Sequence, residues 1–384
     1  MASIPQSTVR KCVAWLIVIG VISYAAFSHR VLFVRTFGCE ATSGTLAKFQ
    51  FCLREGMRFS VNSVAWSPDG DYIATGSAYS REIHVWNVRS RTIVRKLSIP
   101  YPPPAFHQLA WSPDGLFLAA CDGTNVLRIY DTRTWEPAHV FRELHDLGAC
   151  DHPAFSSDSK RIAVIGVRLV EYSVPDWSML GSASLREGWA KGDLFNAVAY
   201  VPRTHTVLVG GGQYIRDPRD RELEPWDGRV WFFCPGDNIP CRNITVYPRA
   251  GGHAGGGPVA ALATSPDGRT AVAATNSGVM RANDIPVEPV HVIRLSDGAT
   301  VGAPLDHMIP YGAAVGLAYT ADNTYIIVGH EQVDGAIHIV NAESYAVEDF
   351  IRAGGFVSDI AVNQRNKEFA VGAGNKVLVW SLPR

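Results

Sequence analysis

Few of the reactive side chains in this sequence stand at a spacing that a known reaction requires. One short stretch collects side-chain types that can bind zinc: His145, Asp146, Cys150, Asp151 and His152. Their spacing matches no standard zinc site, and polar side chains in such a place more commonly cap strand ends. We therefore expect no metal at this stretch.

Catalytic motifs are absent elsewhere in the chain. The segment HEQVD, which begins at His330, starts like a zinc-protease motif but lacks the second histidine. The sequence contains no Gly-x-Ser-x-Gly motif, no P-loop and no Cys-x-x-Cys pair. The glycine-rich segment 251–257 lacks the spacing that binds dinucleotides. These absences predict a protein that is not an enzyme and holds no cofactor.

The cysteines suggest disulfides rather than a reactive site. Cys12 lies in an apolar segment, and six others remain. Cys234 and Cys241 bracket the turn residues Pro-Gly-Asp, so a disulfide can close this turn in an oxidising compartment. Two further pairings are open to the sequence: Cys39 with Cys52, and Cys121 with Cys150. The alternative is free thiols that pack as small hydrophobic side chains.

A repeated unit must position all of these residues. A triplet of an aliphatic residue, alanine and an aromatic residue begins each copy, as in Val64-Ala65-Trp66. The triplet returns in strict or looser form after 45, 44, 45, 64, 55 and 43 residues. Three copies carry the turn Ser-Pro-Asp-Gly, at 67–70, 112–115 and 265–268. A period in the forties with four strands per unit is typical of a β-propeller, in which seven such blades stack in a ring.

These repeats resemble the WD-repeat family of seven-bladed β-propellers over about residues 45–384. Three pairs stand where the Trp-Asp pair of that family ends the third strand: Trp86-Asn87, Tyr130-Asp131 and Trp380-Ser381. The Gly-His pair that precedes each unit in the family is missing here. The resemblance implies an all-β, seven-bladed ring. The expected blades lie near 60–97, 104–142, 149–184, 194–246, 257–304, 312–350 and 355–384.

The last blade lacks a fourth strand, because only a few residues follow its third strand, Val377 to Trp380. The segment 45–53, TLAKFQFCL, lies just before the first blade and alternates between apolar and polar residues. This pattern predicts that Phe49, Phe51 and Leu53 share one face of a strand. We expect the segment to supply the missing strand and close the ring, as N-terminal strands do in WD-repeat proteins.

The fourth and fifth copies are longer than the others, because each contains an insertion between its second and third strands. The insertions span 213–228 and 276–289. In WD-repeat propellers such loops emerge on the same rim as the connection between the two blades, here 247–258. Long loops on a rigid scaffold commonly carry binding, although a tolerated surface insertion is the alternative. The expected partner-binding residues are Tyr214, Arg216, Arg219, Arg221, Trp226, His253 and Arg281.

A polar arc is expected at one mouth of the central channel. Its residues hold equivalent places in four consecutive copies: Asn62, His107, Asp151 and Asn196. A propeller enzyme or small-ligand binder that works outside the cytoplasm, such as a lactonase-like protein, would use this arc. That is the alternative to our leading hypothesis, a non-enzymatic scaffold that binds a protein partner through the rim of blades four and five.

Residues 1–44 lie outside the repeats. We expect a polar N-terminus over 1–11, an apolar segment over 12–34 and a linker over 35–44. The apolar segment predicts a single-pass membrane anchor, and a cleaved signal peptide that releases a secreted protein is the alternative. The basic residues before this segment favour a propeller outside the cytoplasm, in the periplasm or a lumen. The formal net charge is −1 and no basic run occurs, so no nucleic-acid partner is expected.

Overall fold

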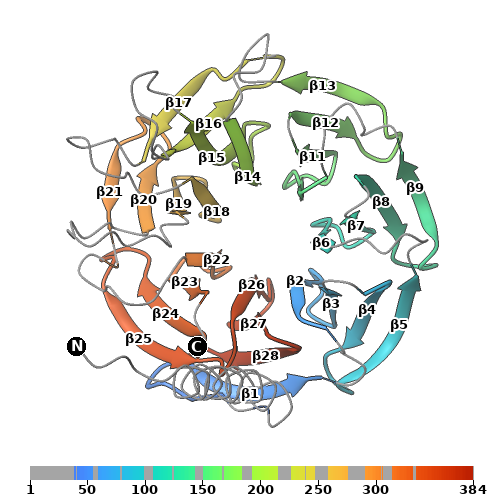
Figure 1. The fold of residues 1–384 in the computed structure, drawn as a ribbon, viewed down its shortest axis with the longest axis vertical. Helices are drawn as coiled ribbons and strands as arrows, with labels where there is room; N and C mark the ends of the chain where they lie inside the picture. Colours follow the sequence, from blue (N-terminus) through green and yellow to red (C-terminus); the bar gives the residue numbers. More distant parts are fainter. Residues whose placement is uncertain are drawn as a thin grey trace, which may run out of the picture. The chain divides into compact units, whose positions relative to one another are not determined.

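The repeats fold into seven four-stranded antiparallel sheets, which form the blades of a ring around a central axis (Figure 1). The structure is a computed structural model that describes residue 39 and the ranges 41–54, 59–77, 80–98, 107–122, 125–142, 150–166, 168–183, 193–214, 226–237, 239–246, 258–275, 290–303, 305, 314–331 and 334–383. The prediction of an all-β, seven-bladed propeller is confirmed.

Each blade begins with a strand near the axis and continues outward to a strand at the circumference (Figure 1). Blade one contains β2 (Val61–Trp66), β3 (Tyr72–Ser77), β4 (Glu82–Asn87) and β5 (Thr92–Ser98). Blade two contains β6 (His107–Trp111), β7 (Phe117–Asp122), β8 (Val126–Asp131) and β9 (Pro137–Phe141). Blade three contains β10 (His152–Phe155), β11 (Arg161–Ile165), β12 (Leu169–Ser173) and β13 (Met179–Ala183).

The remaining blades follow the same order. Blade four contains β14 (Asp193–Tyr200), β15 (Val207–Tyr214), β16 (Trp226–Phe233) and β17 (Arg242–Thr245). Blade five contains β18 (Val259–Thr264), β19 (Thr270–Thr275), β20 (Val290–Arg294) and β21 (Thr300–Gly302). Blade six contains β22 (Ala314–Tyr319), β23 (Tyr325–His330), β24 (Ala336–Asn341) and β25 (Val347–Arg352). Blade seven contains β26 (Val357–Val362), β27 (Glu368–Ala373), β28 (Lys376–Ser381) and, at its outer edge, β1 (Lys48–Leu53).

The hydrophobic core lies between neighbouring blades, because each sheet buries apolar side chains on both faces. One cluster joins Ile73 and Trp86 of blade one to Val377 and Val379 of blade seven. All four of these side chains are fully buried. Burying a large apolar side chain stabilises a fold by about 1.5–3 kcal/mol. A blade therefore gains most of its stability from its two neighbours, which explains why the repeats form a closed ring.

The turn between the first and second strands of a blade repeats one hydrogen-bond pattern. In blade one the Ser67 hydroxyl donates to the Asp69 carboxylate and accepts the backbone N–H of Tyr72 at 2.9 Å. Gly70 follows with a φ of 79°, a conformation that favours glycine. The same hydroxyl–carboxylate bond recurs in blades that lack the Pro-Gly sequence: Ser156 with Asp158, and Thr320 with Asp322. The turn is thus more regular in structure than in sequence.

Strand β1 closes the ring by pairing antiparallel with β28, from Lys48 opposite Ser381 to Leu53 opposite Val377. The N-terminal part of the propeller thereby completes the C-terminal blade, as the sequence predicts. The segment just before β1 adds further bonds. The backbone N–H of Thr42 donates to the carbonyl of Arg352 at 3.0 Å, and the Trp380 indole donates to the carbonyl of Thr42 at 2.9 Å.

The prediction that Phe49, Phe51 and Leu53 share one face of this strand is wrong. A β-bulge at Gln50 shifts the register, so that Phe49 pairs with Trp380 and Phe51 with Val379. Because one extra residue reverses the side-chain alternation, Phe49 packs with the cluster between blades six and seven. Phe51 and Leu53 instead enter the cluster between blades seven and one. One strand therefore fills two blade interfaces.

The carboxylate of Asp349, on β25 of blade six, holds the chain where it enters β1. It accepts the backbone N–H groups of Thr45 at 3.0 Å and of Leu46 and Ala47 at 2.8 Å each. Burial alone would raise the pKa of Asp349, but these hydrogen bonds outweigh it and hold the pKa below its ordinary value. The ionised carboxylate is therefore part of the ring closure.

No helix among the described residues is long and apolar enough to cross a membrane. The apolar segment 12–34, for which we expect this role, lies outside the described residues. The polar N-terminus 1–11 lies outside them as well, as do residues 35–38 and 40 of the linker 35–44.

Replacing Asp349 with Asn should lower the free energy of unfolding by about 2 kcal/mol at neutral pH, because the amide cannot accept all of these N–H groups as a carboxylate does. The pKa of Asp349 is depressed in the folded state, so its contribution is present above the ordinary carboxyl pKa and lost as the pH falls through the folded-state pKa. Urea unfolding measured across acidic pH checks both effects. Glu348→Gln, at an exposed position on the same strand, is the matched control and should change little. Equal unfolding free energies for D349N and the parent at neutral pH would overturn the proposed role.

Candidate functional site

The inner strands of blade four are longer than those of the other blades. Its three inner strands, β14, β15 and β16, have eight residues each, whereas those of the other blades have four to six. The pairing runs without interruption from Val207 opposite Phe233 to Tyr214 opposite Trp226. Two more residues per strand add about 7 Å of paired backbone. The hairpin of β15 and β16 is therefore longer than the corresponding hairpins of the other blades.

The predicted loop 213–228 is wrong at both ends, because strands occupy much of it. Gln213 pairs with Asp227, and Tyr214 with Trp226, in the ladder of β15 and β16. Two of the predicted partner-binding residues, Tyr214 and Trp226, therefore pair with each other at the end of one hairpin. The other predicted residues lie outside the described ranges: Arg216, Arg219, Arg221, His253 and Arg281.

The residues of the predicted polar arc all lie on or directly before inner strands. Asn62 and Asn196 each occupy a β-bulge, in β2 and β14, and His107 begins β6. The amide of Asn196 donates to the backbone carbonyl of Val259 in blade five at 3.3 Å. Asp151 precedes β10, where partial burial raises its pKa although its side chain stays in contact with solvent. Asn196 therefore joins blade four to blade five.

A second inter-blade polar chain was not foreseen from the sequence. The Asp359 carboxylate of blade seven accepts the Ser63 hydroxyl at 2.9 Å and the Val64 N–H at 2.8 Å, both in blade one. Ser63 in turn accepts the N–H of Leu109 in blade two at 3.1 Å. Burial raises the pKa of Asp359 to about 6 despite its hydrogen bonds. Ser63 directly follows Asn62 of the predicted arc, and Asp359 holds the equivalent position in blade seven. A polar residue within an otherwise apolar strand was the sequence feature that could have indicated both.

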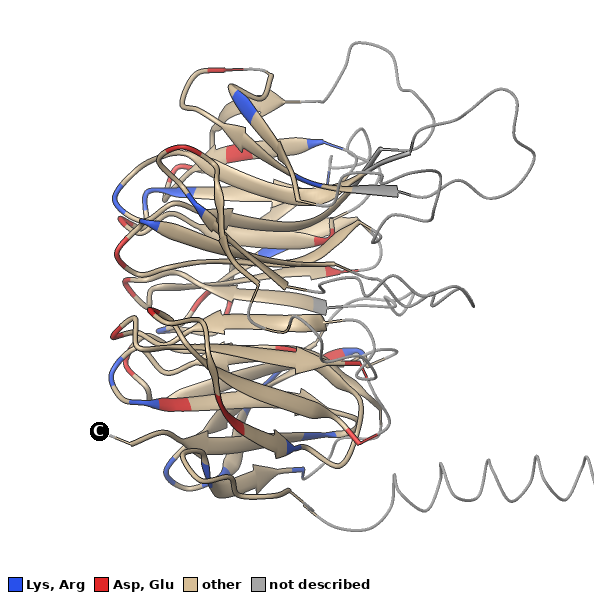
Figure 2. Cartoon of the chain, turned by 90° about the vertical axis from the view of Figure 1, so that its left-hand side faces the viewer, with Lys and Arg blue, Asp and Glu red and all other residues tan. Residues whose placement is uncertain are grey.

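One face of the ring consists of the short turns that connect first to second strands and third to fourth strands. We call it the turn face, and it forms the left-hand side of Figure 2, where the C-terminus lies. Its charged residues tie neighbouring blades together. His205 of blade four lies 3.2 Å from Asp158 of blade three, and Lys367 of blade seven lies 2.8 Å from Asp322 of blade six. Side-chain contacts on the turn face therefore link blade three to blade four and blade six to blade seven.

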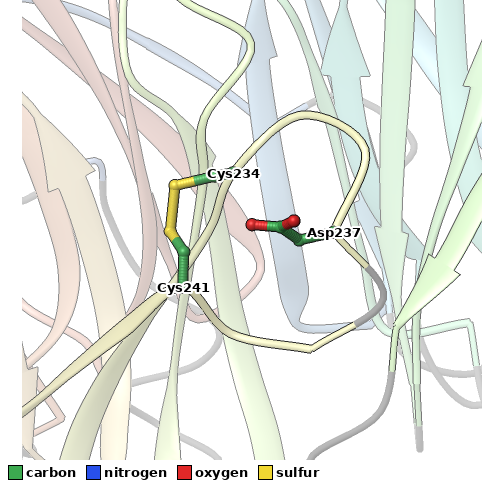
Figure 3. A group of neighbouring side chains, drawn as sticks. All are labelled: Cys234, Asp237 and Cys241. Atoms are coloured by element: carbon green, nitrogen blue, oxygen red, sulfur yellow. A yellow bond between two sulfur atoms is a disulfide. The ribbon is translucent and has the colours of Figure 1, made fainter.

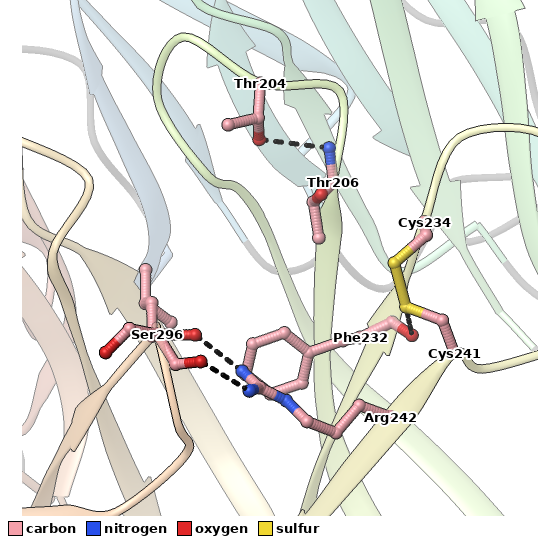
Figure 4. Close-up of a disulfide and its surroundings, with 8 residues drawn as sticks. Thr204, Thr206, Phe232, Cys234, Cys241, Arg242 and Ser296 are labelled. Carbon is pink, nitrogen blue, oxygen red and sulfur yellow. Dashed lines mark hydrogen bonds between the residues drawn. A yellow bond between two sulfur atoms is a disulfide. The ribbon is translucent and has the colours of Figure 1, made fainter.

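A pocket of about 830 Å³ opens on the turn face between blades four and five. Its wall combines Phe232 and Leu295 with the guanidinium group of Arg242 (Figure 4). Arg242 lies over the Phe232 ring at 3.9 Å and donates to the carbonyls of Leu295 at 2.6 Å and Ser296 at 3.2 Å. This arginine therefore fixes the width of the pocket by linking the two blades. The pocket could not be predicted from the sequence, because residues in and beside four separate turns line it.

Disulfides reinforce the propeller, and Cys39 and Cys52 are among the bonded cysteines. Cys121 bonds Cys150, which links blade two to the start of blade three, and Cys234 bonds Cys241 across the turn between β16 and β17. Asp237 brings a carboxylate near the second pair, within 4.8 Å of both sulfur atoms (Figure 3). Metal binding needs thiolates, and the sulfurs here are joined to each other. This group is therefore a covalently closed turn beside the pocket.

Comparison with known proteins agrees with the geometry of the blades. The family described as WD domain, G-beta repeat matches residues 50–87 and 105–131, which correspond to parts of blades one and two. These matches and the seven four-stranded sheets define a β-propeller that carries WD40 repeats.

Relatives match over short stretches. The chain is 32% identical to Protein HIR1 of Cryptococcus neoformans over 83 residues, which cover 20% of this chain and 9% of that protein. It is 31% identical to the Periodic tryptophan protein 2 homolog of Neurospora crassa over 111 residues, or 28% of this chain and 12% of that one. The homolog from Dictyostelium discoideum is 26% identical over 173 residues, or 40% and 18%. The chain thus spans less than a fifth of each relative.

Replacing Asp359 with Asn should remove a distinct pH dependence of stability. Because the folded-state pKa of Asp359 is raised to about 6, the parent protein is stabilised by the protonated acid at low pH and loses that contribution as the pH rises through 6. The loss between about pH 4 and about pH 7 should be on the order of 2 kcal/mol. Urea unfolding of the parent and of D359N over this range measures it. Parallel pH profiles for the two proteins would show that Asp359 is not a buried acid.

Proposed function

We propose that this chain is a non-enzymatic scaffold that presents the blade-four sector of its ring to a protein partner and is tethered to a membrane through residues 12–34. The observation that carries the proposal is the hairpin of β15 and β16, which ends at Tyr214 and Trp226 and has longer strands than the corresponding hairpins of the other blades. Function on a rigid scaffold concentrates where its connections are longest. The repeats shared with WD40 proteins support an interaction role for the ring as a whole.

The composition of the blade-four connection suits a protein interface. Residues 215–225 combine three arginines with aspartate and glutamate, and aromatic residues stand at both ends. Arginine and aromatic side chains contribute much of the binding energy in protein interfaces. A surface that carries both positive and negative charges favours a partner with the complementary charge pattern over other proteins. Arg216, Arg219 and Arg221 are the residues that we expect to contact the partner, together with His253 and Arg281 from the neighbouring connections.

The disulfides support a location outside the cytoplasm. Cys121–Cys150 and Cys234–Cys241 are bonded, and disulfides persist in oxidising compartments such as the periplasm or the lumen of the secretory pathway. The apolar segment 12–34 offers the means of reaching such a compartment. A membrane-anchored propeller outside the cytoplasm accounts for both features.

Excising residues 215–225 and joining Tyr214 to Trp226 through Asn-Gly should abolish partner capture without unfolding the ring. The two residues are opposite each other in an antiparallel ladder, so a two-residue turn can connect them. The measurement is affinity purification of the tagged full chain from its own membranes after chemical crosslinking, followed by mass spectrometry. The thermal unfolding midpoint of the purified variant should stay within about 3 °C of the parent.

A second variant separates loop chemistry from loop length. In it, 215–225 are replaced by a Gly-Ser segment of the same length, which should also lose the partner. Retention of the same crosslinked proteins by both variants would contradict a role for the blade-four sector.

Labelling with a membrane-impermeant maleimide tests the location. We expect the propeller cysteines of intact cells to react only after treatment with a reductant, because they face the outside as disulfides. Labelling that needs opened cells but no reductant would place the propeller in the cytoplasm with free thiols. Mass spectrometry of the labelled peptides identifies which cysteines react.

A further inference from the structure

The pocket between blades four and five has the size and the chemistry of a peptide-binding site. Its volume of about 830 Å³ falls within the range of small-molecule and side-chain pockets, about 300–1,000 Å³. The apolar part of its lining consists of Phe232, Leu295 and Val201 together with the Cys234–Cys241 disulfide. Figure 4 shows Phe232 and this disulfide. The site is built by turns of two blades, and Arg242 bridges them.

The charged residues that line the pocket are all arginines: Arg242, Arg269 and Arg294. Arg242 is occupied by its two carbonyl partners and the Phe232 ring, so it shapes the wall. Arg269 is different, because its side chain is 85% exposed and its Nε lies 3.8 Å from Asp267. A loose pair of this kind is weak and leaves the guanidinium group able to bind another anion.

Arg294 offers a second anchor on the same rim of the pocket. Its Nη1 donates to Asp297 at 2.7 Å, while its side chain remains 50% exposed. Asp267 and Asp297 lie beside these arginines but are not among the residues that line the pocket, whose charged lining residues are arginines and whose apolar ones include Phe232 and Leu295. Guanidinium groups bind carboxylates in a bidentate manner, and apolar floors take aliphatic or aromatic side chains.

We propose that this pocket binds an acidic peptide segment of a partner protein, with an aliphatic or aromatic side chain on Phe232 and Leu295 and flanking carboxylates on Arg269 and Arg294. The proposal rests on the proposed function only in that the partner is a protein. It places a docking site on the turn face, formed by turns that are separate from the connection between β15 and β16. The occupant is a peptide rather than a small anion, since the apolar wall would gain nothing from an anion alone.

Fluorescence polarisation with a defined peptide panel tests the proposal on the full chain with its disulfides intact. Each labelled peptide carries two glutamates around a central leucine or phenylalanine, with one to three residues between them. Matched peptides carry lysine for glutamate, or serine for the apolar residue. At least one acidic peptide should bind, and both matched replacements should weaken it about tenfold or more. Binding should also weaken steeply as salt rises from about 50 mM to about 500 mM.

Arg269→Glu is the critical variant, and it should weaken the bound peptide about tenfold or more without changing the unfolding midpoint. Arg365→Glu is its matched control, because it makes the same charge change at an exposed turn of blade seven. Arg294→Gln should weaken binding to a smaller extent. If R269E and R365E weakened peptide binding equally, the effect would come from the overall charge of the protein, and the proposal would be overturned.

Two further results would also overturn it. One is a panel in which no acidic peptide binds more tightly than its lysine counterpart. The other is Arg269-dependent binding to vesicles that contain phosphatidylserine, with no competition by peptide, since that would make the site one for a membrane surface. The variant with the Gly-Ser segment at 215–225 should still bind the peptide. Loss of the partner with retention of the peptide, or the reverse, tells the two proposals apart.

Discussion

Pairing of β1 with β28 is the constraint on which the rest of the structure depends. Every blade covers its apolar faces with its neighbours, so a ring is stable only if the first and last blades also meet. The chain solves this by placing β1 in the sheet of blade seven before it continues into blade one. Opening the ring at this point requires the whole β1–β28 ladder to break. Ring closure is therefore maintained by backbone hydrogen bonds as well as by side-chain packing.

The bulge at Gln50 makes this closure more effective than a regular strand would. It directs Phe49 toward the interface of blades six and seven and Phe51 toward that of blades seven and one. Asp349 fixes the same segment from blade six. Ser63 and Asp359 then join the inner strands across the seam. Polar groups of the inner strands thus couple neighbouring blades.

The sequence predicts the fold well because the fold is a repetition. The triplet around Ala65 and the turn after Trp66 each recur at a nearly constant period, and both reflect local backbone preferences. The alternation in 45–53 also identified the closing strand. It could not reveal the bulge, because a bulge is set by the register with β28, which is distant in sequence. The turn-face pocket could not be predicted from the sequence for a similar reason, because Arg242 and Leu295 are far apart in the chain and come into contact only in the folded ring.

Hydrogen–deuterium exchange across β1 tests the central claim most directly, which is that a continuous ring provides the rigid scaffold for both binding sectors. The account predicts that peptides covering residues 45–53 and 376–381 exchange as slowly as those covering β3 and β27, because opening the seam requires disruption of the ring. Rapid exchange of 45–53, with β3 and β27 still protected, would contradict it. That result would describe a ring that opens at blade seven while the other blades remain folded.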